Sequence, residues 1–257
     1  MKKLLYLSIL FSNSIIAQVN TIIEYTFQDK NNYICSSNLY IVNNEAIFKL
    51  NDDRENGIYE NKLEKSEYKV NNDKISKLLF STEKNTITRI PLYNDEIIYK
   101  TENNEIKYDL TGNTKKIDNY NCQEARLSLN GRKYTIWFTT DIPISFGPYK
   151  INGLPGLAME ITEETNNFKI QFKSLKKLTD TTDFNNFKKY ILSKPALEYN
   201  KYEETIINLM TSKKIKQIAT ANESGVTIQY AKGQVSFTTF LIDIPTNLVS
   251  KLENITQ

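Results

Sequence analysis

Histidine is absent from this sequence, and cysteine, proline and glycine are scarce, with 2, 6 and 8 residues among 257. Without histidine the chain can build neither a Ser-His-Asp nor a Cys-His catalytic arrangement, and no metal site with histidine ligands. Two cysteines are too few for a four-thiolate metal site within one chain. No glycine-rich phosphate loop and no Gly-x-Ser-x-Gly nucleophile motif occurs. We therefore predict no cofactor, no metal and no catalytic residue.

A strong excess of charge of one sign is also absent. The 33 basic residues face 30 acidic ones, a formal net charge of +3. Nucleic-acid binding needs a basic surface that neutralises phosphates, so this balance argues against a nucleic-acid partner. Hydrophobic residues make up 40% of the sequence and aromatic residues 11%, which is enough to build a folded core.

The first apolar run is short and follows two lysines. Residues 1–17 read MKKLLYLSILFSNSIIA, the layout of a secretory signal peptide. The run is too short to span a bilayer stably, and no later stretch is longer. We expect cleavage after Ala17 and export to the periplasm, the outer membrane or the cell exterior, without a transmembrane segment in the mature chain. A buried first strand or helix is the alternative.

Cys35 and Cys122 are the two cysteines. In an oxidising compartment they could form a disulfide, which would stabilise the fold by about 4 kcal/mol in the chain-entropy model. Two buried thiols are the alternative, and both stay open from the sequence. Cys35 lies well past the expected cleavage site and follows Tyr-Ile rather than small residues, so we expect no lipid on it.

Alternation of apolar and polar residues, the period of a half-buried strand, dominates the chain after residue 18. Polar clusters rich in Asn, Asp and Lys separate the alternating runs, and this spacing predicts a meander of antiparallel strands. The expected strands are Val19–Phe27, Ala46–Leu50, Leu78–Phe80, Thr86–Ile90, Glu96–Lys100, Ile106–Leu110, Leu157–Ile161 and Phe168–Phe172, with a last hairpin of Val226–Tyr230 and Val235–Phe240.

The clearest hairpin turns at Asn130-Gly131. Glu124–Leu129 alternates before this pair and Lys133–Thr139 alternates after it. Asn-Gly between two such runs is the strongest short-range hairpin signal, because a type I′ turn needs positive φ at both central residues.

Two segments have helical spacing instead. Asp183–Leu192 and Tyr199–Met210 place apolar residues on one helix face, and Ser193-Lys194-Pro195 separates them. We predict one domain over residues 18–257 that is mainly β with a few helices (α+β). The expected architecture is a curved antiparallel sheet or half-barrel with a two-helix insertion.

Four carboxylates could serve an exported hydrolase that works with carboxylates alone, as glycosidases do. They are Asp141, Glu160, Glu163 and Glu164. A solvent-facing strand position is the simpler interpretation of Glu160, and a solvated turn is the simpler interpretation of Glu163-Glu164. Trp137, the one tryptophan, either lines a second apolar face or cleft, or packs under a loop.

Glycine and proline gather in GPYKINGLPGLAMEI, residues 147–161. Asn152-Gly153 and Pro155-Gly156 have the residue types that tight turns require. We predict that Pro155-Gly156 forms the centre of a type II turn with the glycine at positive φ. Leu154 and Leu157 would then hold this turn against the core.

The region Asn121–Ile161 resembles the signature of the GLPGLI family, exported proteins of Bacteroidota named for a Gly-Leu-Pro-Gly-Leu-Ile core. Here Ala158 ends the core in place of Ile, which removes apolar bulk but no turn residue. The resemblance implies an exported, often envelope-associated accessory protein, and it transfers no catalytic residue. The matching positions are Cys122, Gly131, Arg132, Trp137, Ile142, Pro143, Gly147, Pro148, Lys150, Gly153, Leu154, Pro155, Gly156 and Leu157.

These observations favour a non-catalytic accessory or binding protein of the cell envelope. A curved sheet with helices over its concave face could hold an apolar ligand, a peptide or a partner protein. Some relatives implied by the resemblance are encoded near outer-membrane transport systems, so envelope transport proteins are candidate partners. A structural surface protein without a pocket is the second hypothesis, and a carboxylate-dependent exported hydrolase is the third.

Overall fold

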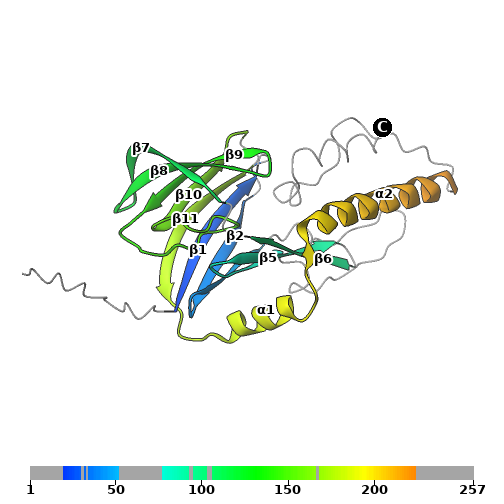
Figure 1. The fold of residues 1–257 in the computed structure, drawn as a ribbon, viewed down its shortest axis with the longest axis horizontal. Coiled ribbons are helices and arrows are strands. Elements are labelled where there is room, and N and C mark those ends of the chain that lie inside the picture. Colours follow the sequence, from blue (N-terminus) through cyan, green and yellow to red (C-terminus); the bar gives the residue numbers. More distant parts are fainter. Residues whose placement is uncertain are drawn as a thin grey trace, which may run out of the picture.

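The computed structural model describes residues 20–29, 32, 34–51, 77–92, 95–102, 106–165 and 168–223. These residues form a mainly β fold with two helices, in which one curved sheet contains all the strands (Figure 1). The predicted fold class is thereby confirmed. The predicted signal peptide and the predicted hairpin at residues 226–240 lie outside the described residues.

Twelve strands and two helices make up the described chain. They are β1 (Thr21–Asp29), β2 (Ile34–Val42), β3 (Glu45–Leu50), β4 (Lys77–Ser81), β5 (Asn85–Leu92), β6 (Asp95–Glu102), β7 (Tyr108–Ile117), β8 (Tyr120–Leu129), β9 (Arg132–Thr139), β10 (Leu157–Glu163), β11 (Phe168–Lys177), α1 (Thr182–Leu192), β12 (Leu197–Glu198) and α2 (Tyr199–Glu223).

The sheet order is β12-β6-β5-β4-β3-β2-β1-β11-β10-β9-β8-β7. Every pairing is antiparallel except β12 with β6, which is parallel. The first strand lies inside the sheet, where it pairs with β2 on one side and with β11 on the other. The sheet therefore consists of two meanders that β1 and β11 join.

Strand alternation creates the main core. In β1, Ile23, Tyr25 and Phe27 are at most 1% exposed, and half-buried residues lie between them. They pack in one cluster with inward residues of β9, such as Ile136 and Phe138, and with residues of the β9–β10 loop. The loop side chains thus form part of the core on the concave side of the sheet.

The Asn130-Gly131 hairpin prediction is confirmed. Asn130 has φ 54° and Gly131 has φ 73°, the two positive values that a type I′ turn requires. β8 and β9 pair through to Leu129 opposite Arg132, directly at the turn.

Alternation did not predict β2 or the two-residue β12, and it predicted β7, β8 and β11 too short. β2 was not expected, because Ser37 stands at an inward position and breaks the apolar pattern, although it is fully buried. β7 continues to Ile117, beyond the expected end at Leu110. Its residues are mostly exposed at the edge of the sheet, so alternation does not mark them.

Both helices form where helical spacing predicts them. α1 begins at Thr182 and packs Phe184 and Ile191 on a cluster of β2, β3 and β4. α2 begins at Tyr199 and packs Tyr202 and Ile206 on β5 and β6. It continues beyond the expected end, to Glu223, through a polar sequence that has no continuous apolar stripe. None of the described helices is long and apolar enough to cross a membrane.

Cys35 and Cys122 are buried thiols, so the disulfide alternative is not the one the structure contains. Cys35 lies in β2 and Cys122 in β8, with β1, β11, β10 and β9 between them in the sheet. The register puts Cys35 on the face of Phe27 and Ala125. Both thiols belong to the main core cluster.

Thiol counting tests this arrangement. We expect a maleimide reagent to label two thiols per denatured chain without any reductant. In the native protein Cys122 should react slowly, because burial excludes the reagent and raises the pKa of its thiol. Mass spectrometry of the labelled chain gives the count. Two labels that appear only after reduction would show that the disulfide forms.

Candidate functional site

The candidate site is the loop between β9 and β10, residues 140–156, which carries the family-like motif. It folds back on itself, with a bridge between Phe146 and Asn152 and a hydrogen bond from the Gly153 N–H to the Ser145 carbonyl. Four of its apolar side chains are at most 4% exposed and belong to the core cluster. They are Phe146, Tyr149, Ile151 and Leu154. The loop therefore occupies the hollow of the sheet.

The predicted type II turn at Pro155-Gly156 is wrong, because Gly156 lies outside the left-handed region. The structure needs a glycine there for space. A Cβ on Gly156 would lie 2.0 Å from the Thr139 carbonyl oxygen and 2.7 Å from its carbon. Gly153, at φ 91°, does have the positive φ that the Asn152-Gly153 pair was expected to supply. Leu154 and Leu157 are buried in the core, as predicted.

The tip of the loop is strained and tightly packed. A Cβ on Gly147 would lie 2.4 Å from the Ile151 carbonyl oxygen, so backbone meets backbone here. Tyr149 has φ 60°, a left-handed conformation that a bulky residue rarely adopts. Its ring is buried, 6.3 Å from the ring of Phe168 on β11. Core packing holds Tyr149 in this conformation, and thereby fixes the direction of Lys150.

Lys150 is the most unusual side chain of the motif, because it is a lysine inside the core. It is 4% exposed, and its Nζ lies 2.7 Å from the Tyr99 hydroxyl oxygen on β6. The same Nζ lies 4.7 Å from the centre of the Tyr99 ring. Burial disfavours the charged amine and lowers the pKa of Lys150 from 10.5 to about 7.

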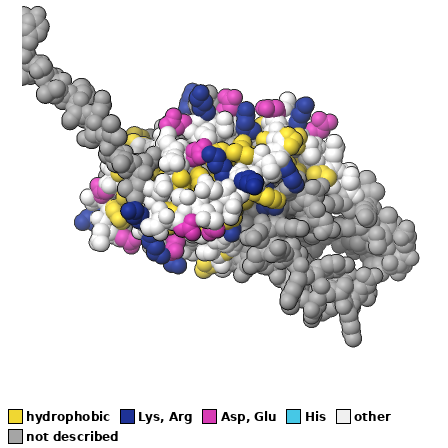
Figure 2. Space-filling model, turned by 90° about the horizontal axis from the view of Figure 1, so that it is seen from below, with side chains coloured by type: hydrophobic (Ala, Val, Ile, Leu, Met, Phe, Trp, Pro, Cys, Tyr) yellow, Lys and Arg dark blue, Asp and Glu magenta, His cyan; other side chains and the backbone are white. Residues whose placement is uncertain are grey.

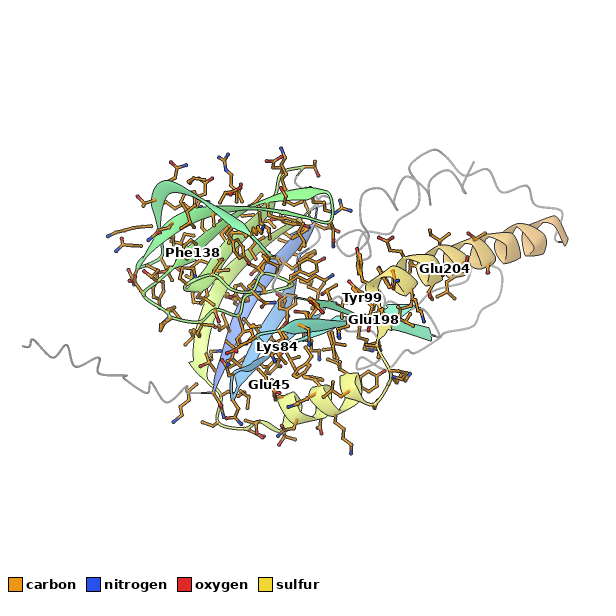
Figure 3. The ribbon with its side chains drawn as sticks, viewed as in Figure 1. Glu45, Lys84, Tyr99, Phe138, Glu198 and Glu204 are labelled. Atoms are coloured by element: carbon orange, nitrogen blue, oxygen red, sulfur yellow. The ribbon has the colours of Figure 1, made fainter. Side chains whose placement is uncertain are left out.

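Tyrosine rings surround this contact. The ring of Tyr202, from α2, stacks on Tyr99 with centres 4.0 Å apart, and Tyr199 lies beside both. In Figure 3, Tyr99 lies where β6 meets the start of α2, away from Phe138 in the curved part of the sheet. Burial raises the pKa of Tyr99 well above 10, so this tyrosine stays protonated.

Asn152 provides a second connection from the loop. Its side-chain amide donates to the Thr86 hydroxyl of β5 at 3.3 Å, and its backbone carbonyl accepts from the Tyr108 hydroxyl of β7 at 2.7 Å. The loop therefore joins β5 and β6 to β7, strands that lie near opposite ends of the sheet order. The loop that carries the sequence motif thus connects both ends of the curved sheet through side-chain hydrogen bonds.

Trp137 and the predicted carboxylate Glu160 lie together on the other face of the sheet. Glu160 pairs with Trp137 in the β9–β10 register. The Lys115 ammonium lies 4.4 Å over the Trp137 ring and 2.9 Å from one Glu160 oxygen, and Lys169 lies 3.2 Å from the other. Burial alone would raise the pKa of Glu160, but hydrogen bonds and charges of the two lysines hold it below 4.5. This carboxylate is ionised and paired.

The other predicted carboxylates do not join Glu160 in a cluster of acids. Glu163 is buried and accepts hydrogen bonds from the Thr165 N–H and hydroxyl. Glu164 is exposed and lies 3.9 Å from Lys133. Asp141 is exposed at the start of the loop. Among the described residues no cluster of Cys, Asp and Glu could hold a metal ion.

Sequence reasoning found the motif but missed its partners. Tyr99, Thr86 and Tyr202 occur in runs that merely indicate a strand or a helix. The one available signal was Lys150 itself, a lysine between an aromatic residue and isoleucine in an otherwise apolar loop. Its partner is distant in sequence, so no local pattern connects the two.

The fold and the motif loop define a single-sheet β domain, and comparison with known families identifies its family. The family model described as N-glycanase peptide, N-terminal domain (PNGase F-II N-terminal) matches residues 31–201. The chain belongs to this family. The match covers β2 to the start of α2, and thus includes the whole motif loop. The resemblance to the GLPGLI family stays a prediction.

Solved structures of similar shape include two crystal forms of PNGF-II. They have 14% and 16% sequence identity to the chain, each with a TM-score of 0.49, and cover 72% and 73% of it. The chain spans 32% of the length of PNGF-II. The match to an uncharacterised conserved protein from Thermus thermophilus covers 69% of this chain and 90% of that protein. The sequence identity is 10% and the TM-score is 0.35. None of the curated proteins compared with the chain matches it.

Replacing Gly156 tests the close backbone approach. We expect Gly156→Ala to lower the free energy of unfolding by about 2–4 kcal/mol, because the Thr139 backbone cannot move away without disturbing β9. Gly112→Ala is the matched control: a Cβ there meets nothing within 4 Å, and its φ of 80° costs about 1 kcal/mol. Urea unfolding measures both. Equal losses would contradict the spatial argument.

The ion pairs of Glu160 predict a pH effect. A carboxyl whose pKa is lower in the folded state stabilises the fold above its unfolded pKa of 4.5, and this contribution is lost as the pH falls through the lower pKa of the folded state. We expect Glu160→Gln to lower the free energy of unfolding by no more than about 1 kcal/mol at pH 6, since the ion pairs are partly solvated. At pH 3.5 its free energy of unfolding should be closer to that of the wild type. Glu164→Gln should show no difference at either pH. Urea midpoints at both pH values provide the measurement.

Proposed function

We propose that this chain is an exported, non-catalytic binding domain that engages a glycosylated or other envelope polypeptide with the outer face of its sheet. The observation that carries the proposal is that the β9–β10 loop fills the concave side of the sheet. The motif loop supplies its own Phe146, Tyr149, Ile151 and Leu154 to the concave side, where an apolar ligand would otherwise enter. A ligand there would have to displace the loop and break the Lys150–Tyr99 contact.

The outer face offers a different kind of surface. Around Trp137 it presents a carboxylate, two ammonium groups and the Gln171 amide, whose nitrogen lies 3.3 Å from a Glu160 oxygen. An aromatic ring among hydrogen-bonding groups suits polar ligands such as sugars or peptide backbones. Figure 2 shows acidic and basic side chains interspersed on one face of the molecule, with hydrophobic side chains scattered among them.

Absence of catalysis is part of the proposal. The best-placed carboxylate, Glu160, is held ionised by Lys115 and Lys169, whereas a general acid must keep its proton near neutral pH. The family takes its name from an N-terminal domain of an N-glycanase, which supports a role beside an enzyme. That name also makes an N-glycosylated polypeptide the first ligand class to test.

Export and an envelope partner complete the proposal. Residues 1–17 have the layout of a secretory signal peptide, and glycosylated or transported polypeptides would meet the domain outside the cytoplasm. Outer-membrane transport proteins are the second partner class, proposed from the GLPGLI resemblance.

A binding assay with a matched ligand pair tests the function. The mature chain is immobilised and exposed to an N-glycosylated protein and to the same protein after enzymatic removal of its glycans. We expect the chain to bind the glycosylated form and to bind little of the deglycosylated one. Mass spectrometry should detect no released glycan. Glycan release would overturn the non-catalytic assignment. Binding of neither form, with no envelope protein retained from an extract, would overturn the binding function.

Charge reversal maps the surface in the same assay. We expect Lys169→Glu to weaken binding at least tenfold, because it removes a partner of Glu160 and adds a repulsive charge beside it. Lys188→Glu is the control: Lys188 is similarly exposed and also pairs with a glutamate, Glu45, but it lies on α1. Equal effects of the two variants would contradict the outer-face assignment.

A further inference from the structure

A second glutamate on the outer face of the sheet lies between two lysines, in the same way as Glu160. One carboxylate oxygen of Glu24 on β1 lies 3.2 Å from Lys176 Nζ, and the other lies 3.9 Å from Lys173 Nζ. The Ser174 hydroxyl also donates to the second oxygen, at 2.9 Å. Hydrogen bonds from Ser174 and Lys176 lower the pKa of Glu24, so this carboxylate is ionised at neutral pH.

The strand register puts the two glutamates on one face. Glu160 of β10 pairs with Gln171 of β11, which pairs with Thr26 of β1. Thr26 is two positions from Glu24 in a strand whose burial alternates regularly, so their side chains share a face. Glu24 in turn pairs with Ser174, three positions beyond Gln171 along β11. The two sites are therefore about 10 Å apart, and one elongated ligand can contact both.

The glutamates at both sites are more covered than their lysines. The side chains of Glu24 and Glu160 are 32% and 16% exposed, and each paired lysine is more exposed than its glutamate. Each site holds two ammonium groups and one carboxylate, a surplus of one positive charge, so an approaching ligand meets ammonium groups first. We call these residues the lysine surface. They are Glu24, Lys115, Glu160, Lys169, Lys173 and Lys176.

We propose that the lysine surface binds an acidic glycan, a sugar chain that carries carboxylates. This inference rests on the proposed function and specifies the ligand class for the same face. The surplus ammonium groups complement the charge of the carboxylates. Hydrogen bonds between ammonium and carboxylate groups are also stronger than those between neutral groups. A neutral glycan would leave this surplus without a partner.

The neutral groups of the surface distinguish a sugar from an acidic peptide. The Lys115 Nζ lies 4.4 Å over the Trp137 ring, so a carboxylate bound to this ammonium would place its sugar beside the ring. The apolar face of a sugar packs well on an aromatic ring. Gln171 and Ser174 add an amide and a hydroxyl beside the two glutamates, and sugar hydroxyls can donate to or accept from such groups.

Three forms of one N-glycosylated protein test the ligand class against the immobilised chain. Its glycans end in sialic acid, which carries a carboxylate, in the first form, lack it after sialidase treatment in the second, and are removed in the third. We expect the sialylated form to bind about tenfold more tightly than the desialylated one at low salt. This advantage should shrink to about threefold or less in 0.5 M NaCl, because salt screens exposed charges.

The outcomes separate this inference from the proposed function. Equal affinities for the sialylated and desialylated forms would overturn the acidic ligand class and leave glycan binding intact. Binding of neither glycosylated form, or equal binding of the third form, would overturn both. Poly-glutamate is the probe for charge alone, and we expect it to bind more weakly than the sialylated protein at matched carboxylate concentration. Equally tight binding of poly-glutamate would overturn the glycan assignment.

Lys173 offers a variant that leaves the core untouched, since its side chain is 65% exposed. We expect Lys173→Gln to weaken binding of the sialylated form about threefold and to leave that of the desialylated form unchanged, because only a charge is removed. Lys173→Arg keeps the charge and should bind like the wild type.

Lys133→Gln is the matched control. Lys133 is 68% exposed and lies 3.9 Å from Glu164, the same distance that separates Lys173 from Glu24. Glu164 is itself 54% exposed, so this pair presents both charges to solvent without a surplus. We expect the control to bind the sialylated form like the wild type. Equal losses in Lys133→Gln and Lys173→Gln would overturn the assignment of the ligand to the lysine surface.

Discussion

The hydrogen bond between a buried lysine and a buried tyrosine organises the concave side of this molecule. A twelve-stranded open sheet has two ends that backbone hydrogen bonds do not join, so side chains inside the hollow are the available connection between them. The β9–β10 loop makes this connection by placing Lys150 on Tyr99 and Asn152 on Thr86. A partly charged group in an apolar core is costly, so its presence at this junction indicates that position matters more than maximum stability.

The glycines of the motif allow the β9–β10 loop to make these contacts. Gly147 and Gly156 are required because backbone atoms of Ile151 and Thr139 occupy the space of a Cβ, whereas Gly153 is required for its positive φ. A loop that fills a hollow this closely cannot at the same time be an open ligand site. For this reason the proposed function uses the outer face around Trp137, where the polar side chains remain within reach of solvent.

Local rules predicted much of the fold, and the distant contacts lay beyond them. Asn130-Gly131 was predictable because the turn depends on two adjacent residues. β2 was not, because the buried Ser37 interrupts an apolar pattern that only its neighbours in the sheet complete. Gly156 was recognised as a necessary glycine for the wrong reason, since the close approach of Thr139 is a tertiary contact. Lys150 and Tyr99 are 51 positions apart, and their pairing depends on the curvature of the entire sheet.

The position of the first strand has a consequence for the order of folding. Thr21 pairs with Lys177, so the interior edge of β1 has no partner until most of the described chain is available. Pairings of this sequence separation carry a high entropic cost of closure, and they slow the formation of a sheet. The first meander, β1 to β6, can assemble from neighbouring hairpins, but it presents the hydrogen-bonding groups of β1 to solvent until β11 arrives. A slow and late closing step is built into the order of the strands.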